Sequence, residues 1–198
     1  TKSVLNTVSS LVHNDKSLMM VYLDLLQPLL GRIGKLWEKS EISVAHEHLA
    51  TAIIGKAMAL LQRDWVLRSP SKGKALIASV PGEEHFLGPW MVADLFTMNR
   101  WDVSYLGANT PRQDLIAFAE AEQSDLILLS ATIPTNIYDA IVLCREIKAK
   151  SSLLHSKLIL GGQAFLPVGK GRQKLAVDAL SCDPLHAVSL ANDWWEQR

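Results

Sequence analysis

The feature that most constrains this chain is a regular alternation of short apolar runs with longer amphipathic stretches after residue 73. Such short apolar runs predict buried strands rather than core helices. Strands that alternate with helices indicate a parallel sheet with helices on both faces. The expected strands are 75–80, 101–106, 126–130, 157–160 and 187–189, and the expected helices are 88–100, 112–123, 137–149 and 170–180.

The first third of the chain has helical spacing instead. Apolar residues recur there at intervals of three and four, which places them on one helix face: Leu18, Tyr22, Leu25, Leu29, Ile33 and Leu36. Pro28 lies inside this run and predicts a kink or a division into two helices. Ser43 is the candidate N-cap of a helix over 44–62, and residues 4–12 predict a shorter helix. We expect a small helical bundle of four pieces.

The two patterns meet at Ser69-Pro70-Ser71-Lys72-Gly73. The sequence therefore predicts two domains, a helical bundle over residues 1–69 and an α/β domain over residues 73–198. In doubly wound sheets, ligands bind at the carboxyl ends of the strands near the point where the strand order reverses. The loops that follow Val80, Leu106, Ser130 and Leu160 are the candidate sites.

Composition excludes some classes of function. The chain has 20 Lys and Arg against 20 Asp and Glu, so it carries no net charge that would attract a phosphate backbone. We expect no direct binding of nucleic acid by this segment. We also expect no membrane association, since no apolar run approaches the roughly 20 residues of a bilayer span. Two cysteines, Cys144 and Cys182, and the lack of a signal pattern predict a cytoplasmic protein, or part of a longer one.

The four candidate loops carry motifs in a fixed order. These are Glu83-x-His85-x-x-Gly88, Leu106-Gly107-x-x-x-Pro111, Ser130-x-Thr132 and Gly161-Gly162. The set resembles the cobalamin-binding domain that methionine synthase, corrinoid methyl carriers and cobalamin-dependent mutases share. The resemblance covers residues 73–195, with Glu83 where the family has Asp. It implies that the helical bundle is followed along the chain by a Rossmann-like (flavodoxin-like) parallel sheet.

The resemblance assigns His85 as the lower axial ligand of cobalt and as the metal-binding residue. Imidazole suits a borderline transition metal, and Glu83 would accept the other ring N–H and so raise the basicity of the ligand. The hydroxyls of Ser130 and Thr132 would hold the displaced tail of the corrinoid. Gly161 and Gly162 would let this tail pass close to the backbone. The other cofactor-binding residues that the resemblance implies are Gly88, Leu106, Gly107, Ser130, Thr132, Gly161 and Gly162.

The helical third carries a second motif, in which Trp37 is followed after nine residues by Glu47-His48. This spacing resembles the helical cap of CarH-like cobalamin-dependent photoreceptors. It implies adenosylcobalamin as cofactor, with Trp37, Glu47 and His48 at its upper face. An indole face and a carboxylate that accepts hydrogen bonds from ribose suit an adenosyl group. Related photocobilins also hold a bilin, and the sequence leaves that second chromophore open.

The function expected from both resemblances is light sensing without catalysis, with no catalytic residue. Photolysis of adenosylcobalamin would change the conformation of the bundle, and with it the contacts within a homo-oligomer or with a regulatory protein partner. Transcription or another downstream effector would respond to this change. Glu38 stands where the photoreceptors have a cobalt-capturing His, and His46 or His48 would have to substitute. These photoreceptors usually carry a helix-turn-helix domain ahead of the bundle, so we expect either that this sequence is part of a longer chain or that regulation passes through a protein partner. The alternative is a corrinoid methyl-carrier protein of a methyltransferase system.

Overall fold

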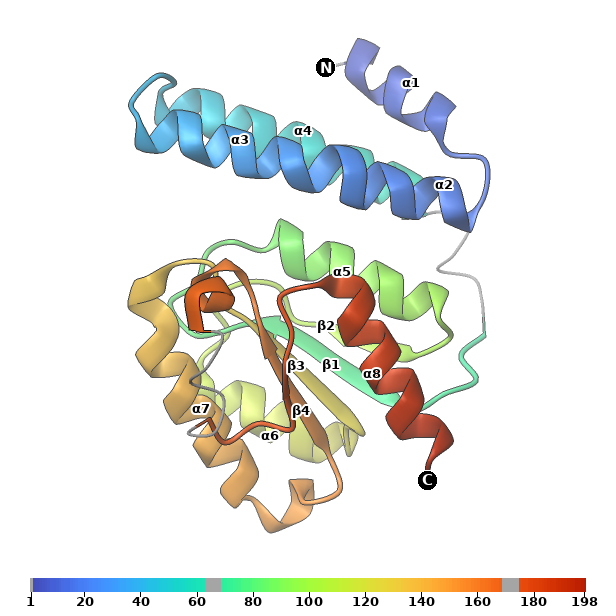
Figure 1. Ribbon diagram of the computed structural model, residues 1–198, viewed down its shortest axis with the longest axis vertical. Coiled ribbons are helices and arrows are strands. Elements are labelled where there is room, and N and C mark those ends of the chain that lie inside the picture. Colours follow the sequence, from blue (N-terminus) through green and yellow to red (C-terminus); the bar gives the residue numbers. More distant parts are fainter. Residues whose placement is uncertain (1, 63–68, 169–174) are drawn as a thin grey trace. The chain divides into compact units, whose positions relative to one another are not determined.

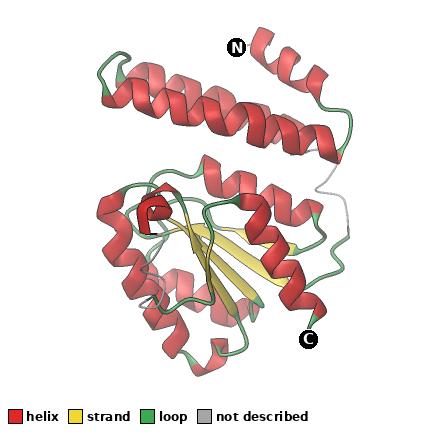
Figure 2. Ribbon diagram, in the orientation of Figure 1, coloured by secondary structure: helices red, strands yellow, loops and turns green. Residues whose placement is uncertain are grey.

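The computed structural model describes residues 2–62, 69–168 and 175–198, without the side chains of residues 167 and 168. Two compact units make up the chain, Thr1–Arg68 and Ser69–Arg198. The first is built from helices, and the second combines helices with a sheet (Figure 1, Figure 2). Within the described residues no helix is both long enough and apolar enough to cross a membrane.

The helical unit contains α1 (Lys2–Leu11), α2 (Asp15–Met20), the π-helical segment η1 (Val21–Leu26), α3 (Gln27–Glu38) and α4 (Val44–Leu61). The helical run is continuous from Asp15 to Glu38, since the residues at the junctions of α2, η1 and α3 are all right-handed helical, so the predicted division at Pro28 is wrong. The irregularity lies instead in the π-helical segment η1, which directly precedes the first turn of α3 that contains Pro28. Ser43 is the N-cap of α4, as expected. Leu18, Tyr22 and Met58 are the fully buried centre of this unit.

The α/β unit has one sheet of parallel strands. They are β1 (Lys74–Ser79), β2 (Asp102–Tyr105), β3 (Leu126–Ser130), β4 (Lys157–Gly161) and β5 (Ala179–Leu180), in the order β2-β1-β3-β4-β5. The chain moves from β1 outward to β2 and then returns to β3 on the other side of β1. The strand order therefore reverses between β1 and β3, which makes this the switch point of the sheet.

Helices cover both faces of the sheet. Figure 1 shows α5 (Leu87–Met98) and α8 (Pro184–Glu196) on one face, with α6 (Arg112–Glu122) and α7 (Ile137–Ala149) on the other. Short 3-10 turns, η3 (Pro134–Asn136), η4 (Ser151–Leu153) and η5 (Gln163–Val168), complete the connections. Since both faces are covered, the central strands are apolar throughout rather than alternating.

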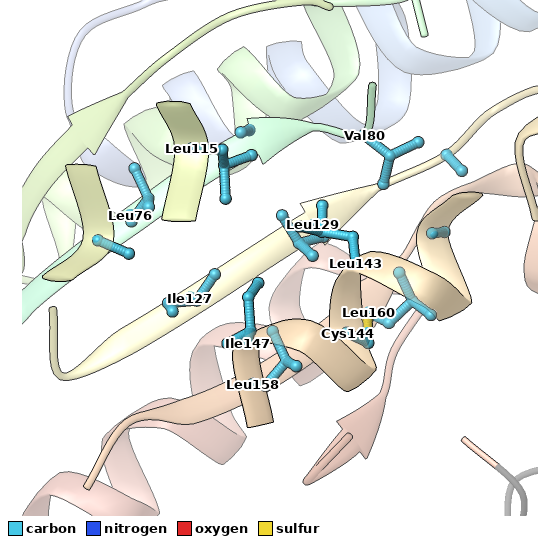
Figure 3. Packing of buried hydrophobic residues seen from close by; sticks show 14 of the residues in the cluster. Leu76, Val80, Leu115, Ile127, Leu129, Leu143, Cys144, Ile147, Leu158 and Leu160 are labelled. Atoms are coloured by element: carbon cyan, nitrogen blue, oxygen red, sulfur yellow. The ribbon is translucent and has the colours of Figure 1, made fainter. Parts of the chain in front are cut away.

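The core beneath α6 and α7 is formed by aliphatic side chains from the strands and both helices (Figure 3). Leu129 comes from β3, Leu160 from β4, Leu115 from α6 and Leu143 from α7, and all four are fully buried. This packing fixes the strands, and with them the positions from which the site loops emerge.

Two predictions for the C-terminal region are wrong. Residues 187–189 lie within α8 rather than in a strand. Asp183 caps this helix by accepting a hydrogen bond from Leu185 N at 2.8 Å, and the short apolar run is its buried face. The edge strand is instead β5, which lies at the end of the helix predicted over 170–180. Residues 175–178 form bends, and 170–174 lie outside the described residues.

Trp195, one of two adjacent tryptophans near the C-terminus, has a packing role. The Trp195 ring lies edge-on to Trp101 with 5.7 Å between the ring centroids. Trp101 Nε1 also donates to Asn192 Oδ1 at 3.0 Å, which ties α8 to the start of β2. A cavity of about 300 Å³ beside these rings is lined also by Leu126 and Lys157, at the amino ends of β3 and β4. The cavity therefore lies at the amino ends of the strands, whereas the candidate loops follow their carboxyl ends.

We expect Leu143→Ala to lower the free energy of unfolding by about 2–5 kcal/mol. The side chain is fully buried, so its removal leaves a cavity that the surrounding core fills only in part. Leu154→Ala is the matched control, since its side chain is 71% exposed. Urea denaturation followed by circular dichroism measures both. Equal losses for the two variants would contradict this view of the core.

Candidate functional site

The loop after β1 carries a buried carboxylate beside an accessible imidazole. Glu83 is fully buried, and its Oε1 lies 2.5 Å from His85 Nδ1. The same oxygen accepts a hydrogen bond from His85 N at 3.1 Å. The His85 side chain is 56% exposed. The structure thus brings together the two residues that the motif predicts as ligand and orienting acid.

The other oxygen of Glu83 is held by the loop after β3. Its Oε2 accepts hydrogen bonds from Thr132 N at 2.8 Å, Ile133 N at 3.0 Å and Asn136 Nδ2 at 3.0 Å. Because β1 and β3 are neighbours, these two loops emerge side by side at the switch point. One carboxylate therefore joins the two loops where a ligand of this fold is expected.

The protonation state of the pair follows from these contacts. Burial by itself raises the pKa of Glu83, but its hydrogen bonds with His85, Ile133, Asn136 and Thr132 outweigh burial and lower the pKa to about 2. An ionised carboxylate only accepts hydrogen bonds, so His85 Nδ1 must donate. The lone pair of the neutral ring then lies on Nε2, which is the tautomer that binds a metal through Nε2.

The loop after β2 braces the same turn. Asn109 Oδ1 accepts a hydrogen bond from Gly82 N at 2.9 Å, and Asn109 N donates to Glu83 O at 3.1 Å. Its Nδ2 donates to Glu84 Oε1 at 2.8 Å. Asn109 has a φ of +51°, a conformation that asparagine adopts more easily than most residues.

Two asparagines were therefore missed as site residues. Asn109 and Asn136 hold the loop of Glu83, yet Asn109 is only a variable position of Leu106-Gly107-x-x-x-Pro111 and Asn136 lies outside the motifs. A signal was present, since Asn109 lies within a motif and Asn136 follows one by four residues, both in loops predicted to face the site. A short amide side chain in such a loop is suited to bridging backbone groups.

Other predicted residues have distinct surroundings. Gly88 is exposed in the first turn of α5, and a Cβ there would meet no atom within 4 Å, so packing does not require glycine. Gly107 has a φ of +75°, which does favour glycine. Leu106 is half-buried and packs against the core under α6 and α7.

The remaining motif residues lie at the ends of β3 and β4. Ser130 is buried, in register with Gly161, and Thr132 is half-buried in the loop. A Cβ on Gly161 would clash with Ser181 O, and one on Gly162 with Ala131 O. The structure thus gives the glycine pair a packing reason of its own, besides the passage of a cofactor tail that the resemblance implies.

In the helical unit, α3 and α4 are joined by a short turn, so the end of one helix and the start of the other lie at the same end of the pair (Figure 1). Trp37, near the end of α3, is 48% exposed. Glu47, in the first turn of α4, accepts a hydrogen bond from Thr51 Oγ1 at 2.7 Å. His48 Nε2 is 3.6 Å from Glu47 Oε2, and His46 Nδ1 is 2.8 Å from Ser43 Oγ.

Comparison with protein families agrees with this arrangement. A family model described as a B12 binding domain matches residues 73–179, and a second model with the same description matches residues 1–62. The chain belongs to the B12-binding domain family. A cobalamin is therefore its cofactor class, while the adenosyl form and a bilin remain predictions.

Curated relatives of this B12-binding protein include a corrinoid protein of Desulfitobacterium hafniense (strain Y51), 23% identical over 164 residues, which are 81% of this chain and 75% of the relative. Dimethylamine corrinoid protein 3 of Methanosarcina acetivorans is 25% identical over 137 residues, 67% of this chain and 63% of the relative. The HTH-type transcriptional repressor CarA of Myxococcus xanthus is 30% identical over 105 residues, 53% of this chain and 34% of the relative.

Solved structures show the same fold. The monomethylamine corrinoid protein of Methanosarcina barkeri matches with a TM-score of 0.72 and 18% identity, over 83% of this chain and 78% of that chain. The methanol:cobalamin methyltransferase complex MtaBC of the same organism matches with a TM-score of 0.57 and 15% identity, over 90% and 68% of the two chains. The predicted helical bundle and Rossmann-like parallel sheet are confirmed.

We expect Glu83→Gln to destabilise the B12-binding protein most at neutral pH. A pKa lowered from 4.5 to about 2 corresponds to about 3 kcal/mol of stability, present above pH 4.5 and lost as the pH falls towards 2. The glutamine variant lacks this contribution, so the difference from wild type should shrink on acidification. Urea denaturation at pH 7 and at pH 3 measures it.

Glu84→Gln is the matched control, since Glu84 is the exposed neighbouring carboxylate. It should change the free energy of unfolding little at either pH. A difference between wild type and Glu83→Gln that stays constant from pH 7 to pH 3 would contradict the assignment of an ionised, hydrogen-bonded Glu83.

Proposed function

We propose that this protein binds cobalamin with His85 Nε2 as the lower axial ligand of cobalt. The observation that carries the proposal is the contact of His85 Nδ1 with buried, ionised Glu83, which fixes the tautomer and presents Nε2. Gly88, three residues later, leaves open space in which the face of a macrocycle can approach.

The donor set of the described residues suits this group. No cluster of three or more His, Cys, Asp or Glu side chains occurs in the part of the chain that the structure describes. A corrin supplies the equatorial nitrogens itself, so one well-oriented protein ligand is enough. When bound, cobalamin supplies a cobalt–carbon bond whose alkyl group can be transferred or released by light.

We propose further that the protein is a corrinoid carrier, which presents this alkyl group to a partner methyltransferase. The relatives that align over most of this chain support it, since two are named corrinoid proteins. The methanol:cobalamin methyltransferase complex MtaBC shares the fold and supports the same class of partner. In this function His85 would hold the cobalamin, and the partner methyltransferase would act on the alkyl group that the cobalamin supplies.

Light sensing is the second candidate, and a specific observation favours it. Trp37 exposes nearly half of its indole in the helical unit, at the same end of the α3–α4 pair as Glu47. An exposed indole face is available to pack on a flat group such as adenine. The partial identity with the repressor CarA also supports a regulatory function.

His85→Ala should weaken binding of hydroxocobalamin at least tenfold, since even loss of an orienting partner costs 10–100-fold at metal sites. His155→Ala is the matched control, because His155 is an exposed histidine in the turn before β4. Titration followed by the absorption spectrum measures affinity and ligation together. A histidine-ligated spectrum that persists in His85→Ala would refute His85 as the ligand.

Adenosyl- and methylcobalamin distinguish the two functions. A light sensor should bind adenosylcobalamin more tightly than methylcobalamin, lose this preference in Trp37→Ala, and change its elution volume in size-exclusion chromatography after green light. A carrier should bind methylcobalamin at least as tightly and elute identically in light and dark. Leu60→Ala, which removes another exposed apolar side chain from the helical unit, is the control for Trp37→Ala.

A further inference from the structure

The cavity beside Trp101 is separated from the candidate cobalamin site by the length of the sheet. Its volume is about 300 Å³, and Leu126 and Lys157 line it at the amino ends of β3 and β4. His85 follows the carboxyl end of β1 instead. Strands of five or six residues put about 17–20 Å between these two ends. The volume is at the lower end for small-molecule pockets, so the cavity can take a small ligand besides cobalamin.

One wall of the cavity is aromatic. Trp194 and Trp195, at the end of α8, both line it, and Leu126 and Ala191 add aliphatic surface. Trp195 lies edge-on to Trp101, which is itself bound to α8, so the rings have fixed positions. Indoles arranged in this way favour a flat ring as ligand, because offset and edge-to-face contacts add to the burial of apolar surface.

Two cations lie beside these rings. Lys157 Nζ is 5.5 Å from the centroid of the Trp194 ring, and Arg198 Cζ is 4.8 Å from the centroid of the Trp195 ring. Both cations line the cavity together with one carboxylate, that of Asp125. The lining therefore has a net positive charge, which attracts an anion and repels a further cation.

Lys157 is the cation that is available to a ligand. Its Nζ is 3.7 Å from Asp178 Oδ1, which is too long for a hydrogen bond. Asp178 is bound more closely by other groups, since its Oδ2 accepts hydrogen bonds from Leu158 N at 2.7 Å and from Lys148 Nζ. An ammonium has three donors, and the Lys157 side chain is 46% exposed, so it can bind an anion at the cavity without breaking a short ion pair.

We propose that the cavity binds a small aromatic carboxylate, with its ring against Trp194 and Trp195 and its carboxylate on Lys157. An uncharged ring would forgo the charge-assisted hydrogen bond to the ammonium. Inorganic phosphate has no apolar surface to place against the indoles and would lose much of its water beside them. The site uses no residue of the loops around Glu83, so it is independent of the proposed ligation of cobalt by His85.

Benzoate is the probe for this site. Acetate and benzyl alcohol are its controls, because the first lacks the ring and the second lacks the charge. The measurement is the indole N–H region of the ¹⁵N–¹H correlation spectrum of the full chain, with the Trp194 and Trp195 signals assigned from variants. Benzoate should shift both signals saturably and bind at least tenfold more tightly than either control. Absence of a saturable shift, or equal affinity for all three compounds, would overturn the proposal.

Lys157→Met tests the contribution of the charge, since methionine keeps a flexible apolar stem without a donor. Its affinity for benzoate should fall at least tenfold, towards that for benzyl alcohol. Lys150→Met is the matched control, because the Lys150 side chain is also 46% exposed and forms a similarly long ion pair, 3.6 Å from Glu120, outside the lining of the cavity. It should bind benzoate like wild type. Wild-type affinity in Lys157→Met, or an equal loss in both variants, would overturn the site.

Trp194→Leu tests the contribution of the ring. It should weaken benzoate binding about three- to tenfold and leave acetate binding unchanged, with circular dichroism to show that the variant is folded. Benzoate should also bind with the same affinity when methylcobalamin is present, since the two sites lie at opposite ends of the strands. Competition between benzoate and methylcobalamin would place benzoate in the cobalamin site and overturn this proposal, while leaving His85 as the proposed ligand.

Discussion

The carboxylate of Glu83 is the interaction on which the site depends. A buried charge is costly unless hydrogen bonds replace the water that it loses. Glu83 receives them from its own loop and from the loop after β3, so it is stable only when both loops are in place. The same contacts keep it ionised and fix the ring of His85. Folding of the loops and orientation of the His85 ring are therefore one event.

The parallel sheet makes this arrangement possible. Because β1 and β3 are adjacent and the chain leaves them in opposite directions, their carboxyl-end loops meet without a helix between them. The apolar strands beneath are rigid because helices cover both faces. Loops at such an edge can carry buried polar groups, since each loop supplies the partners that the other lacks.

The chemistry of the site is common to carriers and sensors. A histidine held by an acid suits any corrinoid, whatever is done with the upper face. The comparisons support the carrier over more of the chain, while Trp37 and the likeness to CarA support the sensor. The difference between the two functions thus depends on the helical unit and its partner, and the ligation proposed for His85 is common to both.

The sequence by itself determined the strands β1 to β4, the helices between them and the pair of Glu83 and His85. These follow from local periodicity and from a motif within one loop. It misplaced the fifth strand, because a short apolar run is equally the buried face of a helix such as α8. Only the tertiary structure brought Asn109 and Asn136 to Glu83, and showed the glycine pair packed against other backbone. Such contacts join loops far apart in the chain, and no local pattern encodes them.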